Sequence, residues 1–504
     1  MLKRARAIPL AALALFLAAG LGAFALEAGA ALKTQEERDY GEGIVLWQAA
    51  NVTDWRKAFH PVENYPHIVF HYPPLYHLTA RLVAPATGNL LVAGRLTSIL
   101  SLLGSCLVMA SLAAACLPPA RRPAARWLGA FSAGTLIFTT PVWTWAYTMR
   151  VDTLGVFLSI TGVALFVAAR RRPALAFLSC VCFVAAVYTK QTMVAAPAAC
   201  FLLAFVEKPR RALYLVAFTV AAGLLTLLVL QTLTGGMFLR HVVGYNQNPF
   251  LLRHVFSRWI DHLSKLPALL VVIAVMFPVA LFARRAGGAS ALLKRIRLAL
   301  CRSAFERCAV AGAIYFWLAV AVVTVTIGKK GANFNYFFEV DIAACLLSGL
   351  FLGWLIRRAS FRPRGAHALL TSLVIPLFLL HSVSNFTNLY QGSIKFFRPA
   401  YDYSADVVRL VRETPGPVYS EDMTILMRAG KEIPAEPAII TALALNNRWD
   451  ESSFVRRIEE GQFQAIIARS LDDRDRFTQP VARAVQQRYS LNRELGPYKI
   501  YLPK

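Results

Sequence analysis

Long apolar runs separated by short polar stretches make up most of the first three quarters of the chain. Runs of roughly 20 residues are long enough to cross a hydrocarbon core of about 30 Å as α-helices. The pattern predicts eleven membrane spans, at about residues 8–31, 90–117, 127–145, 153–169, 174–190, 192–206, 212–234, 266–283, 309–327, 339–356 and 367–385. The first run is long for a cleaved signal peptide, so we interpret it as an uncleaved anchor.

Two segments depart from this pattern. Residues 235–265 mix Phe, Leu and Trp with Arg and His, which is typical of a helix lying in the plane of the membrane interface. After residue 385 the long apolar runs end, and short strand-like runs such as "FQAIIARS" and "YKIYLP" alternate with helical patterns such as "SADVVRLVRE". This alternation predicts a small α/β domain. We therefore divide the chain into a transmembrane domain, residues 1–385, with a first outer loop at 33–89, and a C-terminal domain, residues 386–504.

Arginine and lysine gather in every second loop between the apolar runs, for example in "KRAR" at Lys3, "RRRP" at Arg170 and "RRASFRPR" at Arg357. This positive-inside pattern predicts a cytoplasmic N-terminus. An odd number of spans then predicts a C-terminal domain on the outer side, which is the periplasm for an inner-membrane protein of a Gram-negative-like cell. The formal net charge of +26 follows from this topology, so it does not predict a nucleic acid partner.

Composition agrees with a multi-spanning α-helical membrane protein, because 57% of the 504 residues are hydrophobic. All eight cysteines fall in predicted spans or near cytoplasmic loops, so the sequence predicts no disulfide framework. The "CVC" pair at Cys180 lies in an apolar run without histidine or acid nearby, which favours packing over metal binding.

Four carboxylates follow the first apolar run, in the stretch "TQEERDYGEG": Glu36, Glu37, Asp39 and Glu42. In the predicted topology they lie just beyond the outer end of the first span. A solvated loop or the acidic start of a helix is one interpretation. The i,i+3 spacing of Asp39 and Glu42 between glycines, and the scarcity of acids in the other outer loops, favour a site instead.

Polar clusters also recur at the outer ends of other predicted spans. "YTMRVDTLG" contains Arg150 and Asp152, "VYTKQTM" contains Lys190 and Gln191, and "GKKGANFNYFFEVD" contains a third group: Lys329, Lys330, Asn333, Asn335, Tyr336, Glu339 and Asp341. Each cluster alone could be an interfacial anchor or an ion pair. Ionisable groups beside a span are costly, however, and several clusters on one membrane face indicate a functional site.

One carboxylate facing several cations at the lipid boundary suits transfer of a sugar from a lipid-linked phosphate. Cations would hold the phosphate and stabilise it as a leaving group, and the carboxylate would take a proton from the acceptor hydroxyl. The sequence contains no Walker motif, dinucleotide fingerprint or metal-ligand cluster, so it predicts no cofactor and no required metal.

Several stretches resemble GT-C fold membrane glycosyltransferases of the family 39 type, which are related to protein O-mannosyltransferases and aminoarabinose transferases. The matching stretches are "EERDYGEG", "YPPLYHLTARL", "AGRLTSIL", "MRVDTLGVFLSITGVALF", "YTKQTMVAAP" and "NFNYFFEVDIA". The segment "RWDESSFVRRIEEGQFQAIIA" and the closing "YKIYLP" resemble the periplasmic end domain of some bacterial members.

The resemblance implies a catalytic acid in the first outer loop, a polyprenyl-phosphate sugar donor and usually inversion at the anomeric carbon. Some GT-C enzymes also use a divalent ion. The "DYGEG" form implies Asp39 as the acid with Glu42 as its companion, whereas alignment on the tyrosine implies Glu36 and Glu37. The implied substrate-binding set is Lys190, Gln191, Lys330, Asn335, Tyr336, Arg150, Asp152, His71 and Tyr72.

Within this set, Lys190, Lys330 and Arg150 are implied contacts of the donor phosphate. His71 and Tyr72 either shape the acceptor entrance or belong to an interfacial aromatic belt.

The sequence therefore predicts a membrane glycosyltransferase, a hexosyl or pentosyl transferase, that acts on a periplasmic lipid, glycan or protein acceptor. One alternative is a transporter or flippase, which would show inverted repeats and polar groups near the bilayer midplane. Another is an O-antigen polymerase or ligase, which would depend more on arginines and on a large central outer loop. The acid after the first span favours the transferase over both.

Overall fold

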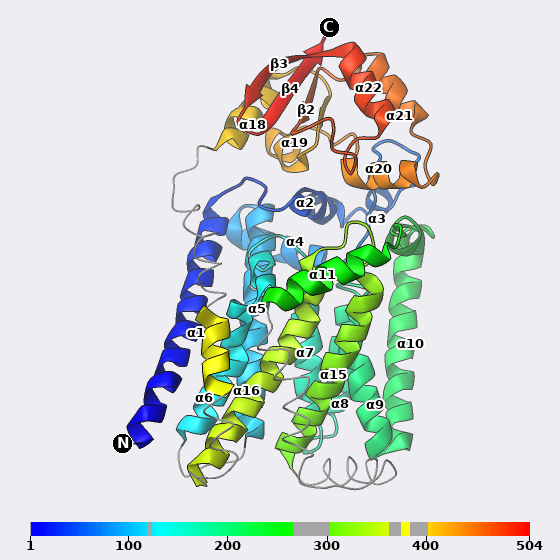
Figure 1. Cartoon of the computed structure of the whole chain (residues 1–504). Coiled ribbons are helices and arrows are strands. Elements are labelled where there is room, and N and C mark those ends of the chain that lie inside the picture. Colours follow the sequence, from blue (N-terminus) through cyan, green and yellow to red (C-terminus); the bar gives the residue numbers. More distant parts are fainter. Residues whose placement is uncertain (1, 118–122, 266–302, 362–373, 384–401) are drawn as a thin grey trace.

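The computed structural model describes residues 2–117, 123–265, 303–361, 374–383 and 402–504. Long helices form a bundle, and a smaller domain that contains the sheet lies beyond one end of it (Figure 1). The N-terminus lies at the opposite end of the bundle, so the bundle separates the start of the chain from this domain. The predicted fold class, a helical membrane domain followed by an α/β domain, is confirmed.

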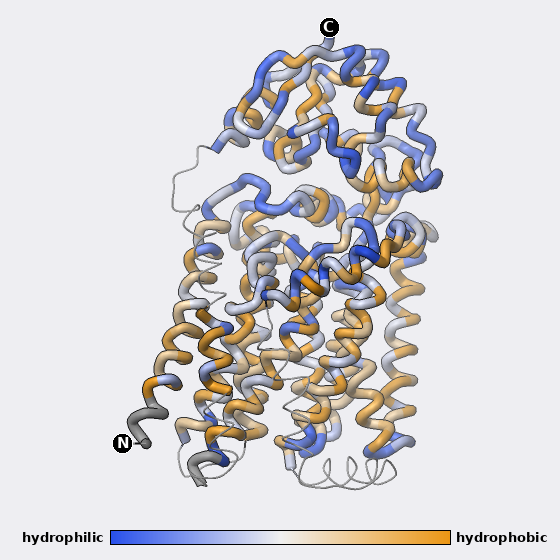
Figure 2. The backbone as a smooth tube through the Cα atoms, in the orientation of Figure 1, coloured by the Kyte–Doolittle hydropathy of each residue, from blue (hydrophilic) through white to orange (hydrophobic). Residues whose placement is uncertain are grey.

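The helices of the bundle are α1 (Leu2–Lys33), α5 (Leu90–Cys116), α6 (Ala124–Thr135), α7 (Asp152–Ala168), α8 (Leu175–Val187), α9 (Ala195–Glu207), α10 (Pro209–Leu233), α15 (Ala304–Thr326) and α16 (Phe338–Phe361). In the described ranges, the segments long and apolar enough to cross a membrane are Ile8–Lys33, Leu90–Cys116, Pro209–Leu233, Ala304–Thr326 and Phe334–Arg358. Helices α7, α8 and α9 and a helix at Val374–Val383 are shorter but also apolar. Figure 2 shows hydrophobic residues along the whole bundle. The span predicted at 266–283 lies outside the described residues, and the one at 367–385 is described only in part.

The span predicted at 127–145 is not one continuous helix. Helix α6 ends at Thr135 and is followed by two short 3₁₀ helices, η1 (Leu136–Thr139) and η2 (Pro141–Trp145). Between them, Thr140 has an extended backbone (φ −102°, ψ 159°). A proline lacks the N–H that a helix interior needs and disfavours helical geometry in the residue before it, so Pro141 accounts for this break.

Short elements cover the end of the bundle that faces the C-terminal domain. They are α2 (Gly41–Asn51), α3 (Trp55–Ala58), α4 (Leu75–Thr87), the π-helical turn η3 (Arg240–Gly244), α11 (Leu252–Lys265) and the 3₁₀ helix η5 (Phe334–Phe337). Helix α11 runs across the bundle, and Leu252, Phe256, Ile260 and Leu263 on it are exposed at helical spacing. This apolar stripe agrees with the interfacial helix predicted within residues 235–265.

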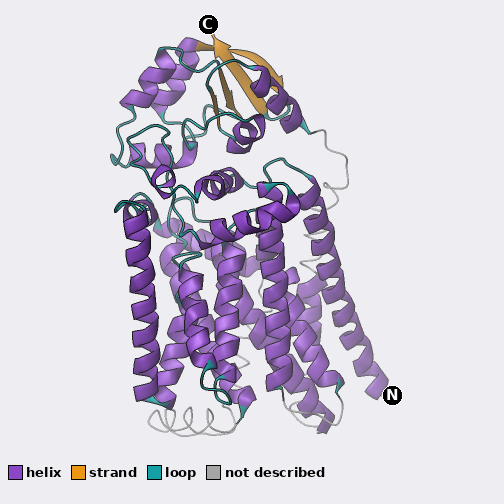
Figure 3. Ribbon diagram, turned by 180° about the vertical axis from the view of Figure 1, so that it is seen from behind, coloured by secondary structure: helices purple, strands orange, loops and turns teal. Residues whose placement is uncertain are grey.

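The C-terminal domain consists of α18 (Tyr403–Glu413), β1 (Val418–Ser420), α19 (Met423–Ala429), α20 (Pro437–Leu445), α21 (Ser452–Glu459), β2 (Ala465–Ala468), α22 (Gln479–Arg488), β3 (Tyr489–Leu495) and β4 (Tyr498–Pro503). The strand order is β1-β2-β4-β3; β1 and β2 are parallel, and β4 is antiparallel to both of its neighbours. Figure 3 shows this sheet with helices around it. The predicted strands at "FQAIIARS" and "YKIYLP" are confirmed.

One hydrophobic core joins the first outer loop to the C-terminal domain. Ile44 and Val45 of α2 belong to the same buried cluster as Ile425 and Leu426 of α19 and Val407 of α18. Apolar burial contributes roughly 25 cal/mol per Å², so this contact holds α2 firmly against the domain. The acidic segment just before α2 is therefore positioned by the C-terminal domain as well as by the helical bundle.

Candidate active site

Asp39 lies at the start of α2 and is paired with Arg150. The carboxylate Oδ2 forms an ion pair with the guanidinium Nη2 of Arg150 and accepts a hydrogen bond of 3.1 Å from the N–H of Gly41. A Cβ atom on Gly41 would collide with the Arg150 guanidinium, so a side chain at this position would have to displace Arg150. The Asp39 side chain remains 19% exposed, so its carboxylate is partly accessible.

Glu42, the companion acid, has a very different environment. Its carboxylate is fully buried and receives two hydrogen bonds from Arg95 of α5, Nε to Oε1 at 2.8 Å and Nη2 to Oε2 at 2.6 Å. The backbone N–H groups of Arg38 and Met149 donate to the same two oxygens, at 2.8 and 2.7 Å. Glu42 therefore joins the acidic segment, α5 and the segment before α7 into one polar network.

The two alternative acids lie elsewhere. Glu37 is directed toward the C-terminal domain, where its Oε2 lies 4.0 Å from Arg469 and its Oε1 accepts from the N–H of Gly43 at 3.2 Å. Burial, reinforced by the negative charge of Asp422, raises the pKa of Glu37 well above its usual value. The Glu36 side chain is only partly buried, and its carbonyl accepts a 2.6 Å hydrogen bond from Arg95.

A second polar cluster lies at the start of α7, two residues after Arg150. The Lys190 Nζ donates to Oδ1 of Asp152 at 2.5 Å, and the Asn335 amide donates to both Asp152 oxygens at 3.1 Å. The ammonium of Lys190 also lies 4.2 Å from the centre of the Tyr336 ring, a cation–π distance. All of these side chains come from the predicted set, and the structure brings them together.

The two adjacent lysines of the predicted "GKKG" stretch point to different places. Lys329 is partly buried, and its Nζ donates to Oδ1 of Asn246 at 2.5 Å. Burial, followed by the positive charge of Lys190, lowers the pKa of Lys329 to about 8. Lys330, the residue chosen from the sequence, instead forms a 2.7 Å ion pair with Asp475 of the C-terminal domain and is 36% exposed.

His71 and Tyr72 lie close to charged residues of both clusters. Burial raises the pKa of Tyr72 to about 12, against the smaller opposing effects of the nearby Arg150 and Lys190 charges. The carbonyl of His71 accepts from the Gln191 side chain at 3.4 Å and from the Asn246 amide at 3.2 Å. The first outer loop thus connects the Asp39 region to the lysines.

The C-terminal domain holds the residue that follows Asp39. The Tyr40 hydroxyl donates to Oε1 of Glu436 at 2.8 Å and accepts from the N–H of Ala438 at 3.2 Å. The guanidinium carbon of Arg476 lies 3.4 Å from the centre of the Tyr40 ring. Tyr40 is therefore fixed at its ring and its hydroxyl by residues almost 400 positions later in the chain.

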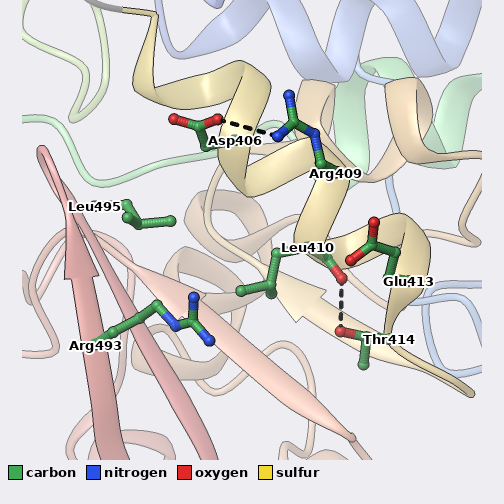
Figure 4. Close-up of a pocket in the computed structure, with 7 residues that line it drawn as sticks. All are labelled: Asp406, Arg409, Leu410, Glu413, Thr414, Arg493 and Leu495. Carbon is green, nitrogen blue, oxygen red and sulfur yellow. Dashed lines mark hydrogen bonds and ion pairs between the residues drawn. The ribbon is translucent and has the colours of Figure 1, made fainter.

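The C-terminal domain also contains a groove of about 460 Å³ between α18 and β3, lined by Asp406, Arg409, Leu410, Glu413, Thr414, Arg493 and Leu495 (Figure 4). None of the predicted site residues lines this groove. In the described residues, no three His, Cys, Asp or Glu side chains converge as metal ligands.

Sequence reasoning missed several participants. Arg95 carried a usable signal, because it is an arginine inside an apolar run and such residues normally have a buried partner. Asn246, which accepts a hydrogen bond from Lys329, is an ordinary polar residue, and nothing in the sequence distinguishes it. The contact of Tyr40 with Arg476 joins the two ends of the chain and leaves no local pattern.

The arrangement of the bundle, the covering short helices and the terminal α/β domain is the GT-C fold of membrane glycosyltransferases. No protein-family model and no curated protein sequence matches the chain. Among solved structures, the chain is similar to ArnT, the aminoarabinose transferase of Cupriavidus metallidurans, bound to undecaprenyl phosphate. The match covers 97% of both chains at a TM-score of 0.57 and 15% identity, and apo ArnT gives 0.58 with the same coverage and identity.

A second similar structure is the Archaeoglobus fulgidus oligosaccharyltransferase tethered to an acceptor peptide. It matches at a TM-score of 0.51 and 13% identity, over 94% of this chain and 72% of that one. Identities this low show a shared fold. The roles of individual residues therefore have to be argued from the contacts described above.

Proposed function

We propose that this protein is a membrane glycosyltransferase that moves a sugar from a polyprenyl-phosphate carrier to an acceptor in the periplasm. The observation that supports this most is the pairing of one accessible carboxylate, Asp39, with a group of cations at the same end of a GT-C bundle: Arg150, Lys190 and Lys329. The ArnT structure similar to this chain contains undecaprenyl phosphate, a lipid of the proposed carrier class.

In the proposed reaction, Asp39 takes the proton from the acceptor hydroxyl as that oxygen attacks the anomeric carbon. The bond from this carbon to the phosphate oxygen breaks, and polyprenyl phosphate leaves with the bonding electrons. Arg150, Lys190 and Lys329 stabilise the negative charge that develops on the leaving phosphate. Direct displacement of this kind inverts the anomeric carbon.

Within this proposal, Asp39 and Glu42 have separate roles. Asp39 is accessible and has hydrogen-bonding capacity left, as a base requires. Glu42 is fully buried and has four hydrogen bonds from Arg95, Arg38 and Met149, so we assign it to positioning. Glu37 lies against the C-terminal domain, which makes it a weaker candidate for the base.

The proposal is tested by supplying membranes with radiolabelled polyprenyl-phosphate sugars and following the label into acceptors. Consumption of a lipid-linked donor supports the enzyme, and a complete panel of pentosyl and hexosyl donors that remains unconsumed would count against it. A flippase would move the lipid without breaking the phosphate–sugar bond. Reporter fusions at the C-terminus test the proposed inner-membrane topology, since a cytoplasmic reporter signal would reverse it.

The two adjacent lysines provide a matched test of the cation assignment. Replacing Lys329 with glutamine should raise the KM for the lipid-linked donor roughly 10-fold or more, because a charged hydrogen bond to phosphate is lost. Replacing Lys330 with glutamine should change it less than about two-fold, since exposed ion pairs such as Lys330–Asp475 contribute little. Steady-state kinetics with both variants decides, and the reverse ranking would restore Lys330 as the phosphate contact.

The pKa of Lys329 also predicts a pH dependence. Its pKa of about 8 means that the ammonium is charged below pH 8 and becomes neutral above it, so donor capture should weaken as the pH rises through this value. The kcat/KM for the donor should therefore fall above about pH 8 in the wild type. Lys329→Arg stays charged and should keep the profile flat to higher pH. An unchanged alkaline limb in this variant would assign the limb to another group.

A further inference from the structure

A fully buried glutamine, Gln48 of α2, connects two histidines of the first outer loop. Its amide nitrogen lies 3.0 Å from the carbonyl oxygen of Val69 and 3.2 Å from Nδ1 of His71. Its amide oxygen lies 2.9 Å from Nε2 of His77, which is also fully buried. Gln48 is therefore the centre of a chain that runs from the interior of the protein to His71.

The contacts of this chain determine where the protons are. A carbonyl oxygen can only accept, so the amide nitrogen of Gln48 must face Val69; the reversed amide would put two oxygens 3.0 Å apart. The second N–H of the amide then faces Nδ1 of His71, an arrangement that favours an unprotonated Nδ1 over one that donates to the Val69 carbonyl. The amide oxygen accepts from Nε2 of His77. The proton of His71 is thereby assigned to its Nε2.

The surroundings of His71 keep the ring neutral. Burial is the largest cause that lowers the pKa of His71 to about 3. The positive charges of Lys329 and Arg150 and the nearby His77 lower it further, whereas the Val69 carbonyl has a smaller, opposite effect. In the described part of the chain, no hydrogen bond uses the Nε2 of His71. A neutral N–H donor is therefore available near Lys329 and Arg150, the cations that act on the ring.

We propose that His71 binds a phosphate oxygen of the polyprenyl-phosphate donor through its Nε2–H, and that Gln48 and His77 are positioning residues that fix this tautomer. The proposal rests on the function proposed above. The positive charges of Lys329 and Arg150 act on the His71 ring, and such cations favour an anionic ligand beside it. A neutral imidazole adds a further donor to such a partner without adding another positive charge beside them.

Two amide replacements test the tautomer, because the amide nitrogen of glutamine reaches about as far as Nε2 and that of asparagine about as far as Nδ1. His71→Asn should raise the inhibition constant of undecaprenyl phosphate roughly 10- to 100-fold and lower kcat/KM for the donor similarly. His71→Gln should keep both within about five-fold of the wild type. Equal losses in the two variants, or full activity in both, would overturn the proposal.

A spectrum that does not depend on activity separates this proposal from the proposed function. In protein labelled with ¹⁵N-histidine and held in lipid nanodiscs, the His71 signal, assigned by its loss in His71→Gln, should show a neutral ring protonated at Nε2 from pH 6 to 8. Gln48→Glu, whose carboxylate accepts from both rings, should move the His71 proton to Nδ1. A ring protonated at Nδ1 in the wild type would contradict the assignment.

The two proposals can fail separately. Suppose the wild-type protein transfers no sugar, but His71 is protonated at Nε2 and His71→Asn binds labelled undecaprenyl phosphate more weakly than His71→Gln does. The proposed reaction then fails and the His71 assignment stands. If sugar is transferred while the ranking or the tautomer differs, the His71 assignment fails alone.

Discussion

Replacing Asp39 with asparagine should lower the rate of sugar transfer about 10²- to 10⁴-fold, the range typical for loss of a general base. Asparagine has nearly the same shape, and its amide oxygen can still accept from the N–H of Gly41, so the loop should keep its structure. The group that takes the proton from the acceptor disappears, and Arg150 loses its anionic partner. Transfer of label from a polyprenyl-phosphate sugar in membranes, measured at saturating donor, reports this loss.

The control for this variant is Glu63→Gln in the same loop, because Glu63 is exposed and forms an ion pair with Arg240 and a 3.2 Å hydrogen bond from the Tyr245 hydroxyl, both away from the candidate site, so transfer should be unchanged. Asp39→Asn should still bind labelled undecaprenyl phosphate, since Arg150 keeps its positive charge when its carboxylate partner is replaced. Full activity in a correctly folded Asp39→Asn protein would rule out Asp39 as the base and return Glu36 and Glu37 to consideration.

Replacing Glu42 with glutamine should destabilise the whole protein by about 3–5 kcal/mol, because Arg95 is then left buried with no opposite charge. Thermal unfolding in detergent, followed by helical circular dichroism, measures this effect. Glu36→Gln is the matched control, since the Glu36 side chain is only partly buried. Unfolding of Glu36→Gln should stay close to that of the wild type.

A double variant tests the cause of this loss. Glu42→Gln combined with Arg95→Met removes both charges and should recover part of the stability, because replacing a buried ion pair by neutral groups costs less than breaking it. A Glu42→Gln protein that unfolds like the wild type but transfers no sugar would show instead that Glu42 takes part in the chemistry.

The different environments of these two acids could not be read from the sequence. Asp39 and Glu42 are three residues apart and share glycine neighbours, so spacing treats them alike. Their environments differ because each one meets a different arginine: Asp39 pairs with Arg150 at a partly exposed position, and Glu42 with Arg95 at a fully buried one. Both arginines are distant in the chain, and their distances are set by helix packing.

Other features could be predicted because their causes are local. Apolar length predicts the long helices, and the alternating pattern after residue 402 predicts the strands β2 and β4. Pro141 is also a local signal for a helix break, but it lies within a continuous apolar run, and that run favours one long span. The different directions of Lys329 and Lys330 could not be predicted from the local sequence. The turn before Gly331 directs Lys329 toward Asn246 and Lys330 toward Asp475.

The contact of Tyr40 with Glu436 and Arg476 has a consequence for the evolution of such proteins. The C-terminal domain is not an accessory that can be exchanged freely, since it supports the residue next to the proposed base. Loss of the aromatic ring at position 40 would remove the hydroxyl that donates to the buried Glu436 carboxylate and the ring that faces Arg476. Changes at these positions are therefore expected to be inherited together, and a domain transplanted from a distant relative would need its own matching first loop.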